Sequence, residues 1–160
     1  MSDKIIKNLP PAGHIGYVVA DVYKAAAEAS GLFELKNTDN IFDFIPMRCW
    51  AWGREISDCH LKVAMIDWTD NFKIEFIQPC GGDIHYSRFL KATGGGMHHT
   101  AHYVDDFEAY RAWLLKKGAE IIFETETEDE IRGYRRSCHV TFQDSRTNIE
   151  VLEIARFRNK

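Results

Sequence analysis

Two histidines and two glutamates occupy matching places in two parts of this 160-residue chain. His14 and His99 each open a β-rich segment and are each followed, seven residues later, by an aspartate. Glu75 and Glu150 lie in apolar runs, 61 residues after His14 and 51 residues after His99. A carboxylate in a buried strand is unfavourable unless it is paired, hydrogen-bonded or bound to a metal. Two imidazoles and two carboxylates suit a divalent transition metal that keeps open positions for water or substrate.

The elements that would position these residues follow the same order twice. Each half reads as a strand that opens on the histidine, a helix that the aspartate caps, and a closing hairpin that contains the glutamate. This is a duplicated βαβββ unit. We expect a tail at 1–12 and a single domain at 13–154, made of modules 13–80 and 96–154 joined by 81–95. Within the second module, the glutamate-rich stretch 124–130 is interpreted as an acidic loop between two strands.

The glycine-rich turn before His99 separates the two modules. In a strand, alternate side chains point to opposite faces. His99 is therefore expected to share one face with Ala101 and Tyr103, while His98 faces the other way. Because only His99 has a counterpart in the repeat, it is the predicted ligand. His98 is a neighbour of the ligand and not itself a ligand, and the remaining histidines are interpreted as structural or surface residues: His60, His85, His102 and His139.

The composition and charge of the chain argue against a nucleic-acid or membrane partner. A net charge of −4 gives no reason to expect a nucleic-acid partner. No apolar run approaches the roughly 20 residues of a membrane helix, and the first residues lack the apolar core of a signal peptide. The four cysteines are scattered without a Cys-x-x-Cys pair, which is typical of free thiols in a reducing compartment. We therefore expect a cytoplasmic protein that acts on a small molecule.

The stretch from Arg88 to Asp106 contains a helix that ends in Phe-Leu, a glycine-rich turn, a His-His-Thr-Ala strand and Val-Asp-Asp. In these motifs and in its repeat, the chain resembles the vicinal oxygen chelate superfamily, and within it most closely the methylmalonyl-CoA epimerases. The resemblance implies an α+β fold in which the modules form a cupped mixed sheet with helices on the outer face. It also implies a homodimer and a divalent ion (Co, Ni, Mn, Zn or Fe) held by His14, Glu75, His99 and Glu150.

What the resemblance implies for chemistry is proton transfer next to a metal-bound carbonyl, catalysed by an isomerase or lyase. Its sharpest form is epimerisation of a 2-substituted acyl-CoA such as methylmalonyl-CoA. Glu150 would serve as both ligand and general base, and Glu55 or Asp58 as a second acid or base. The alternatives are a glyoxalase-type lyase, a non-haem iron dioxygenase, and a resistance-type protein that sequesters a small molecule without catalysis.

Overall fold

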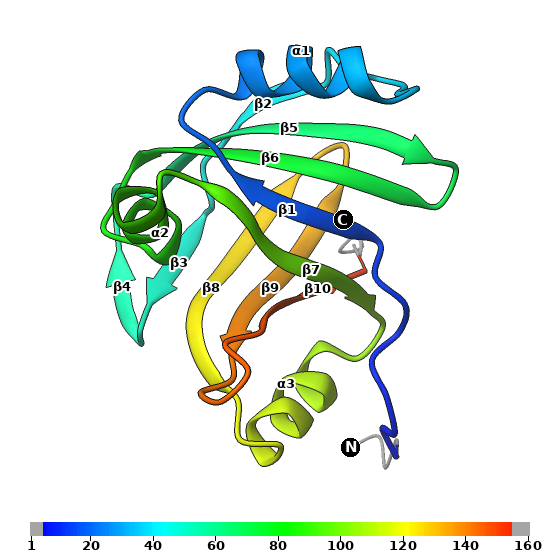
Figure 1. The fold of residues 1–160 in the computed structure, drawn as a ribbon. Coiled ribbons are helices and arrows are strands. Elements are labelled where there is room, and N and C mark those ends of the chain that lie inside the picture. Colours follow the sequence, from blue (N-terminus) through cyan, green and yellow to red (C-terminus); the bar gives the residue numbers. More distant parts are fainter. Residues whose placement is uncertain (1–4, 155–160) are drawn as a thin grey trace.

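The structure, a computed structural model, describes residues 5–154. This part of the chain forms one curled, ten-stranded mixed sheet with three helices (Figure 1). The strand order is β2-β5-β6-β1-β7-β10-β9-β8-β3-β4. The elements are β1 (His14–Val18), α1 (Val22–Leu32), β2 (Ile41–Phe44), β3 (Arg48–Ala51), β4 (Arg54–Ile56), β5 (His60–Thr69), β6 (Phe72–Gly81), α2 (His85–Thr93), β7 (Gly96–Val104), α3 (Phe107–Lys116), β8 (Glu120–Asp129), β9 (Gly133–Thr141) and β10 (Asn148–Glu153).

The two modules meet along the middle of the sheet. In each module the first strand pairs in parallel with the last, β1 with β6 and β7 with β10. The two first strands, β1 and β7, pair with each other in antiparallel fashion. The predicted α+β fold with two tandem modules and a cupped mixed sheet is therefore confirmed. Of the predicted tail at 1–12, residues 1–4 lie outside the described residues.

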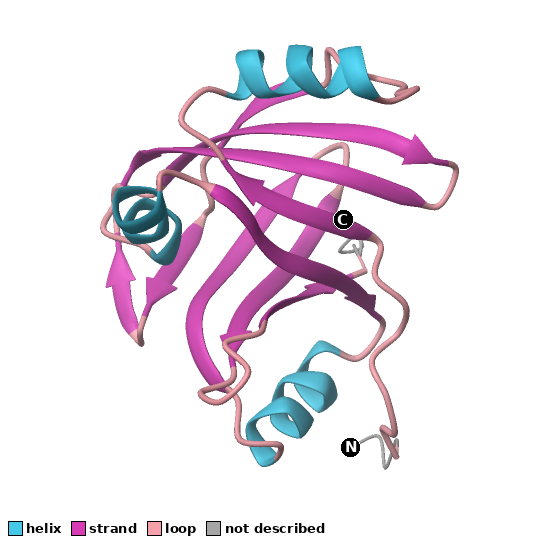
Figure 2. Cartoon of the chain, in the orientation of Figure 1, coloured by secondary structure: helices cyan, strands magenta, loops and turns pink. Residues whose placement is uncertain are grey.

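A short connection brings the two ends of the sheet together. Strand β2 pairs with β5 of its own module, but β3 pairs with β8 of the other module. Only residues 45–47 join β2 to β3, and a connection of this length spans at most about 13 Å. The sheet therefore curls until β2, at one edge, lies near β3 close to the other edge, and Figure 2 shows the curled strand layer.

Helices α1 and α3 cover the outer face of the sheet. The buried side chains of α1 pack against Ile74 and Phe76 of β6. Helix α3 packs in the same way against Val140 of β9 and Val151 of β10. Because side chains alternate along a strand, Glu75 and Glu150 then face the interior. Packing of the two helices thus determines which face of β6 and β10 carries the carboxylates.

Helix α2 lies differently. Ile84, just before it, and Tyr86 in its first turn are buried among inner-face residues that include Ile77 of β6 and Phe123 of β8. The first turn of α2 therefore contributes side chains to the interior of the curled sheet, whereas α1 and α3 only cover its outside. The difference places His85 in the interior as well.

The predicted acidic loop at 124–130 is wrong, because strand β8 continues to Asp129. Along this stretch buried Thr125 and Thr127 alternate with more exposed glutamates. Each threonine lies on the inner face, and the carboxylate of Glu124 accepts a hydrogen bond from Arg111 at 2.8 Å. The alternation of threonine and glutamate is the period of a strand with one polar face. No helix within residues 5–154 is long and apolar enough to cross a membrane.

Candidate metal centre

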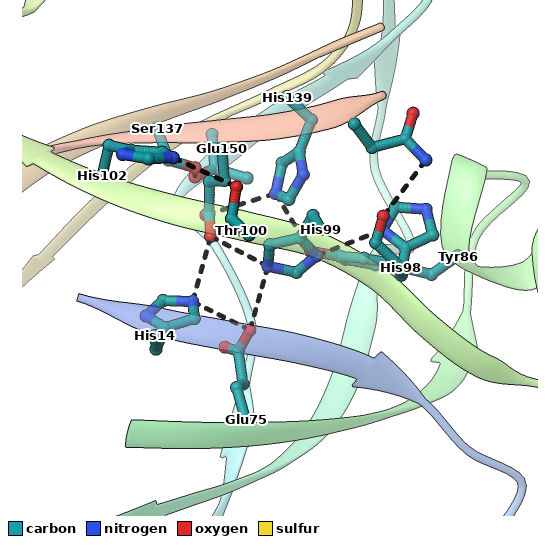
Figure 3. A network of polar contacts seen from close by, with 12 residues as sticks. His14, Glu75, Tyr86, His98, His99, Thr100, His102, Ser137, His139 and Glu150 are labelled. Carbon is teal, nitrogen blue, oxygen red and sulfur yellow. Dashed lines mark hydrogen bonds and ion pairs between the residues drawn. The ribbon is translucent and has the colours of Figure 1, made fainter. Parts of the chain in front are cut away.

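The four predicted ligands come together inside the curled sheet, one from each of the four adjacent strands β6, β1, β7 and β10 (Figure 3). The Nε2 atom of His14 lies 3.3 Å from Oε2 of Glu75 and 3.4 Å from Oε2 of Glu150. The Nε2 atom of His99 lies 3.4 Å and 3.3 Å from the same two oxygens. The cluster is deeply buried, since Glu75 has the most exposed of the four side chains, at 13%. We call these four residues the tetrad.

Strand register explains the convergence. Gly16 of β1 lies opposite both Glu75 of β6 and His99 of β7. Ala101 of β7 lies opposite both Glu150 of β10 and His14 of β1. A small residue therefore stands two positions after each histidine. Gly16 leaves room for the ring of His99, and Ala101 leaves room for the ring of His14. The space is tightest at Gly16, where an added Cβ would lie 2.1 Å from Cε1 of His99.

The donor atoms fit a divalent transition metal. Ligands at about 2.0–2.2 Å from a common zinc-like ion stand roughly 3.3 Å from one another, and the nitrogen–oxygen distances here are 3.3–3.4 Å. Within residues 5–154, three of the four atoms are buried without a hydrogen-bond partner, namely His14 Nε2, His99 Nε2 and Glu75 Oε2. Buried polar atoms rarely stay unpartnered. A cation bound by two imidazoles and two carboxylates would satisfy them.

Burial and the mixed charges shift the protonation of the tetrad in the metal-free protein. Burial alone lowers the pKa of His14, but Glu75 and Glu150 outweigh it and raise that pKa well above its usual value. Burial alone raises the pKa of Glu75, but His14 and His99 lower it to about 2. Burial alone also raises the pKa of Glu150, but His139 and the tetrad histidines outweigh burial and lower this pKa well below its usual value. Both carboxylates are therefore ionised at neutral pH.

A second layer of side chains orients the ligands. Nδ1 of His14 lies 2.9 Å from the hydroxyl of Tyr103, and Nδ1 of His99 lies 3.1 Å from Nδ1 of His98. A histidine that binds a metal through Nε2 has its proton on Nδ1. His14 would then donate to Tyr103 and His99 to His98, which leaves both Nε2 lone pairs directed at the centre of the tetrad.

The prediction that His98 points away from His99 is wrong. The pairing of β1 with β7 skips one residue, so that Gly16 lies opposite His99 but Tyr17 lies opposite Met97. His98 is the extra residue of this β-bulge, and a bulge redirects the side chains next to it. Both histidine rings are consequently buried and in contact.

Sequence reasoning also missed two interior histidines. His139 is buried, and its Nε2 lies 3.2 Å from Oε1 of Glu150 and 3.0 Å from the hydroxyl of Tyr86. His85 is buried beside it, with ring centroids 4.6 Å apart. The sequence did contain a signal for His139. It stands between the apolar residues Cys138 and Val140 of a strand, so its side chain must point to the opposite face of the sheet. Nothing in the sequence marked His85 in the same way.

The structure does not bring Glu55 and Asp58 to the tetrad. Both are exposed, and Glu55 lies on the β3–β4 hairpin at the edge of the sheet. Its carboxylate accepts a hydrogen bond from Nε of Arg48 at 3.1 Å. In the described part of the chain, neither residue contacts His14, His99 or the tetrad carboxylates.

Comparisons with known proteins identify a family and several similar folds. A family model described as the Glyoxalase/Bleomycin resistance protein/Dioxygenase superfamily matches residues 13–142. A search of curated proteins gave no significant match. Among solved structures, methylmalonyl-CoA epimerase from Mycobacterium tuberculosis is 19% identical with a TM-score of 0.64, over 96% of this chain and 95% of that one.

Two further structures are similar to the same degree. One is a hypothetical protein from Bacillus halodurans C-125, which is 19% identical with a TM-score of 0.63 over 93% of this chain and 97% of that one. The other is a Streptomyces coelicolor methylmalonyl-CoA epimerase variant in complex with 2-nitronate-propionyl-CoA. It is 19% identical with a TM-score of 0.63 over 93% of this chain and 100% of that one. At this identity the likeness concerns the fold.

Proposed function

We propose, because the chain belongs to the glyoxalase/bleomycin resistance/dioxygenase superfamily, that it is a divalent-metal-dependent isomerase or lyase. Its reaction would transfer a proton at a carbon next to a carbonyl group. The observation that supports this proposal best is the convergence of two imidazoles and two carboxylates on one buried point. When bound there, a divalent cation would supply positive charge that makes such a proton more acidic.

Glu150 is the proposed general base. Its Oε2 faces the two tetrad histidines, while its Oε1 lies 3.2 Å from Nε2 of His139. The carboxylate is ionised, so it can accept a proton. The His139 imidazole, which contacts the hydroxyl of Tyr86, holds the second oxygen and limits rotation of the carboxylate.

Glu75 is the proposed second proton carrier, in place of Glu55 and Asp58. Epimerisation removes a proton from one face of a carbon and returns one to the other face, so it needs two carriers. Glu75 and Glu150 reach the same point from opposite modules. Glu55 and Asp58, by contrast, are exposed away from this point.

The similar structures support a class of substrate. Two of them are methylmalonyl-CoA epimerases, one in complex with a nitronate analogue of an acyl-CoA. We therefore propose a 2-substituted acyl-CoA such as methylmalonyl-CoA as the first candidate substrate. A glyoxalase-type lyase, which acts on a hemithioacetal by the same proton transfer, is the alternative within this chemistry. We also expect a homodimer, which light scattering after gel filtration would test.

The tetrad argues against two other functions. A non-haem iron dioxygenase uses two histidines and one carboxylate and keeps its remaining positions for oxygen and substrate. A fourth protein ligand, which the tetrad contains, would occupy one of these positions. A protein that only sequesters a small molecule needs no ligand set of this kind.

Metal analysis followed by hydrogen exchange tests the proposal. The tag-free protein is loaded with cobalt, nickel, manganese or zinc, and methylmalonyl-CoA is incubated with each form in deuterated water. We expect a mass increase from exchange of the α-proton, absent with the Glu150→Gln variant and unchanged with the exposed-site control His60→Ala. Failure to bind any divalent ion would overturn the whole proposal. Metal binding without exchange would exclude the epimerase and leave the hemithioacetal reaction to be assayed.

A further inference from the structure

A second cluster of ring nitrogens lies beside the tetrad. His85 of α2, His98 of β7 and His139 of β9 each place one ring nitrogen within 4.8 Å of the others. All three side chains are buried, with residues 5%, 7% and 1% exposed. We call these residues the triad. None of them belongs to the repeated His–Glu pattern, so the duplication of the fold does not explain them.

The triad contains unpartnered polar atoms. Both ring nitrogens of His85 and the Nδ1 of His139 are buried without a hydrogen-bond partner within residues 5–154. Leaving such a group unpaired is unfavourable, so proteins rarely do so without a reason. The unpartnered nitrogens of His85 and His139 belong to neighbouring rings, 4.6 Å apart at their centroids. A cation bound to ring nitrogens of both histidines would give each ring a partner.

The space and chemistry of the triad suit a metal ion. Its ring centroids are 4.6–6.4 Å apart, and Phe89, Phe123 and Tyr86 pack against them. This spacing accommodates an ion among the rings but not an organic ligand. Imidazole nitrogens are donors that suit zinc and similar late transition metals, and one nitrogen from each of the three rings lies within 4.8 Å of the others.

The partners of His139 match the surroundings of a metal ligand. Ligating histidines usually donate their other ring N–H to a carboxylate or another oxygen. Nε2 of His139 lies 3.2 Å from Oε1 of Glu150 and 3.0 Å from the Tyr86 hydroxyl. With the proton held at Nε2 by Glu150, the free Nδ1 presents its lone pair to the triad.

We propose that His85, His98 and His139 form a second metal site, which binds zinc or a similar late transition metal through three imidazoles. Three histidine nitrogen ligands and one open position are typical of zinc, whereas manganese prefers oxygen. The site is linked to the tetrad through the contacts of His139 with Glu150 and of His98 with His99. Because its Nδ1 accepts from His99, His98 would bind the ion through Nε2 as an imidazolate, and its Nε2 proton leaves to solvent. The proposal does not depend on which reaction the tetrad supports.

Metal stoichiometry distinguishes the two sites in the wild-type protein. Tag-free protein is equilibrated separately with zinc and with manganese, freed of unbound ions and subjected to elemental analysis. We expect two zinc ions but one manganese ion per chain. Cobalt titration gives an independent reading, because a four-coordinate, nitrogen-rich cobalt ion absorbs visible light more strongly than one with more oxygen ligands. The second equivalent of cobalt should produce this strong absorption, and its absence would overturn the proposal.

Three variants assign the ions. His85→Phe, which keeps an aromatic ring against Phe123, should bind one zinc ion per chain. Glu75→Gln, which does not touch the triad, should also bind one zinc ion but no manganese. The control His60→Ala removes an exposed histidine beside Asp43 and should still bind two. One zinc ion in the wild type, lost in Glu75→Gln, would overturn the second site but not the proposed function. Two zinc ions in His85→Phe would place the second ion elsewhere, and none in the wild type would overturn both proposals.

Discussion

The two modules supply the same pair of ligands but surround them differently. The first module provides His14 and Glu75, and the second provides His99 and Glu150. In the second module Glu150 also contacts His139, whereas the polar contacts found for the Glu75 carboxylate in the described chain are with the tetrad histidines. The duplicated backbone therefore explains the ligands, but not what holds them in place.

Strand β7 provides the groups that orient both histidines. Tyr103 contacts His14 of the other module, and His98 contacts His99. The position in the first module that matches His98 is Gly13, where an added Cβ would lie 2.4 Å from the ring of Tyr103. The ring of Tyr103, in the second module, thus occupies the space that a side chain at position 13 of the first module would need. The modules therefore differ in that the second one supplies the side chains that contact Nδ1 of both histidine ligands.

Loss of a carboxylate from either module should have the largest effect, and the effect should be unequal. Glu75→Gln and Glu150→Gln each remove a charged ligand, so metal affinity should fall by more than the 10–100-fold that is typical of losing an outer-shell partner. Glu150→Gln should be the more harmful, because it also removes the carboxylate that His139 contacts. Isothermal titration with manganese measures both affinities. Equal losses would show that the contact with His139 does not matter for the tetrad.

Gly16→Ala should disrupt the centre from the backbone side. The new Cβ would lie 2.1 Å from the ring of His99, and a shift of this ring moves a ligand. Overpacking of a buried site costs roughly 1–3 kcal/mol of unfolding free energy, and metal binding should weaken together with stability. Thermal unfolding with and without metal measures both effects.

Gly31→Ala is the matched control, since nothing lies within 4 Å of its added Cβ and the residue is in helix α1. Replacing a helical glycine by alanine stabilises a helix by roughly 0.5–1 kcal/mol. A Gly16→Ala protein as stable as this control, with unchanged metal affinity, would contradict the close approach of His99 to β1.

Tyr103→Phe tests the influence of β7 on the first module. It removes the hydroxyl 2.9 Å from Nδ1 of His14 but leaves all four ligands. Metal affinity should fall by about 10–100-fold, as for other outer-shell partners of histidine ligands. The exposed Tyr23→Phe in α1 should have no effect on metal affinity. If Tyr103→Phe binds metal as tightly as the wild type, the orientation of His14 depends on strand β1 alone.

The parts of this site that could be predicted from sequence are those that repeat or alternate. His14 and His99 could be matched because each precedes an aspartate by the same interval, and Glu75 and Glu150 because each lies in an apolar run. The structure brings these four residues together. Such patterns are local to a strand and its next helix, so they survive without knowledge of the tertiary structure.

The remaining parts depend on contacts between distant segments. The bulge that turns His98 toward His99 arises from pairing with β1 and has no marker in β7 itself. The burial of His85 depends on where α2 packs, and the closing of the sheet depends on pairing of β3 with a strand of the other module. Residues whose role comes from such contacts could not be identified from their own neighbourhood in the chain.

Glu55→Gln and Asp58→Asn should have the smallest effects and give the clearest contrast with the tetrad carboxylates. Both residues are exposed, and Glu55 is engaged with Arg48, so neither substitution changes the charge or shape of the interior. We expect unchanged metal stoichiometry and unchanged α-proton exchange for both, against loss of exchange for Glu75→Gln and Glu150→Gln. A large loss of exchange in either exposed variant, with metal still bound, would mean that the β3–β4 region moves toward the centre when substrate binds. The second proton carrier would then be Glu55 or Asp58, and the role of Glu75 would be limited to binding the metal.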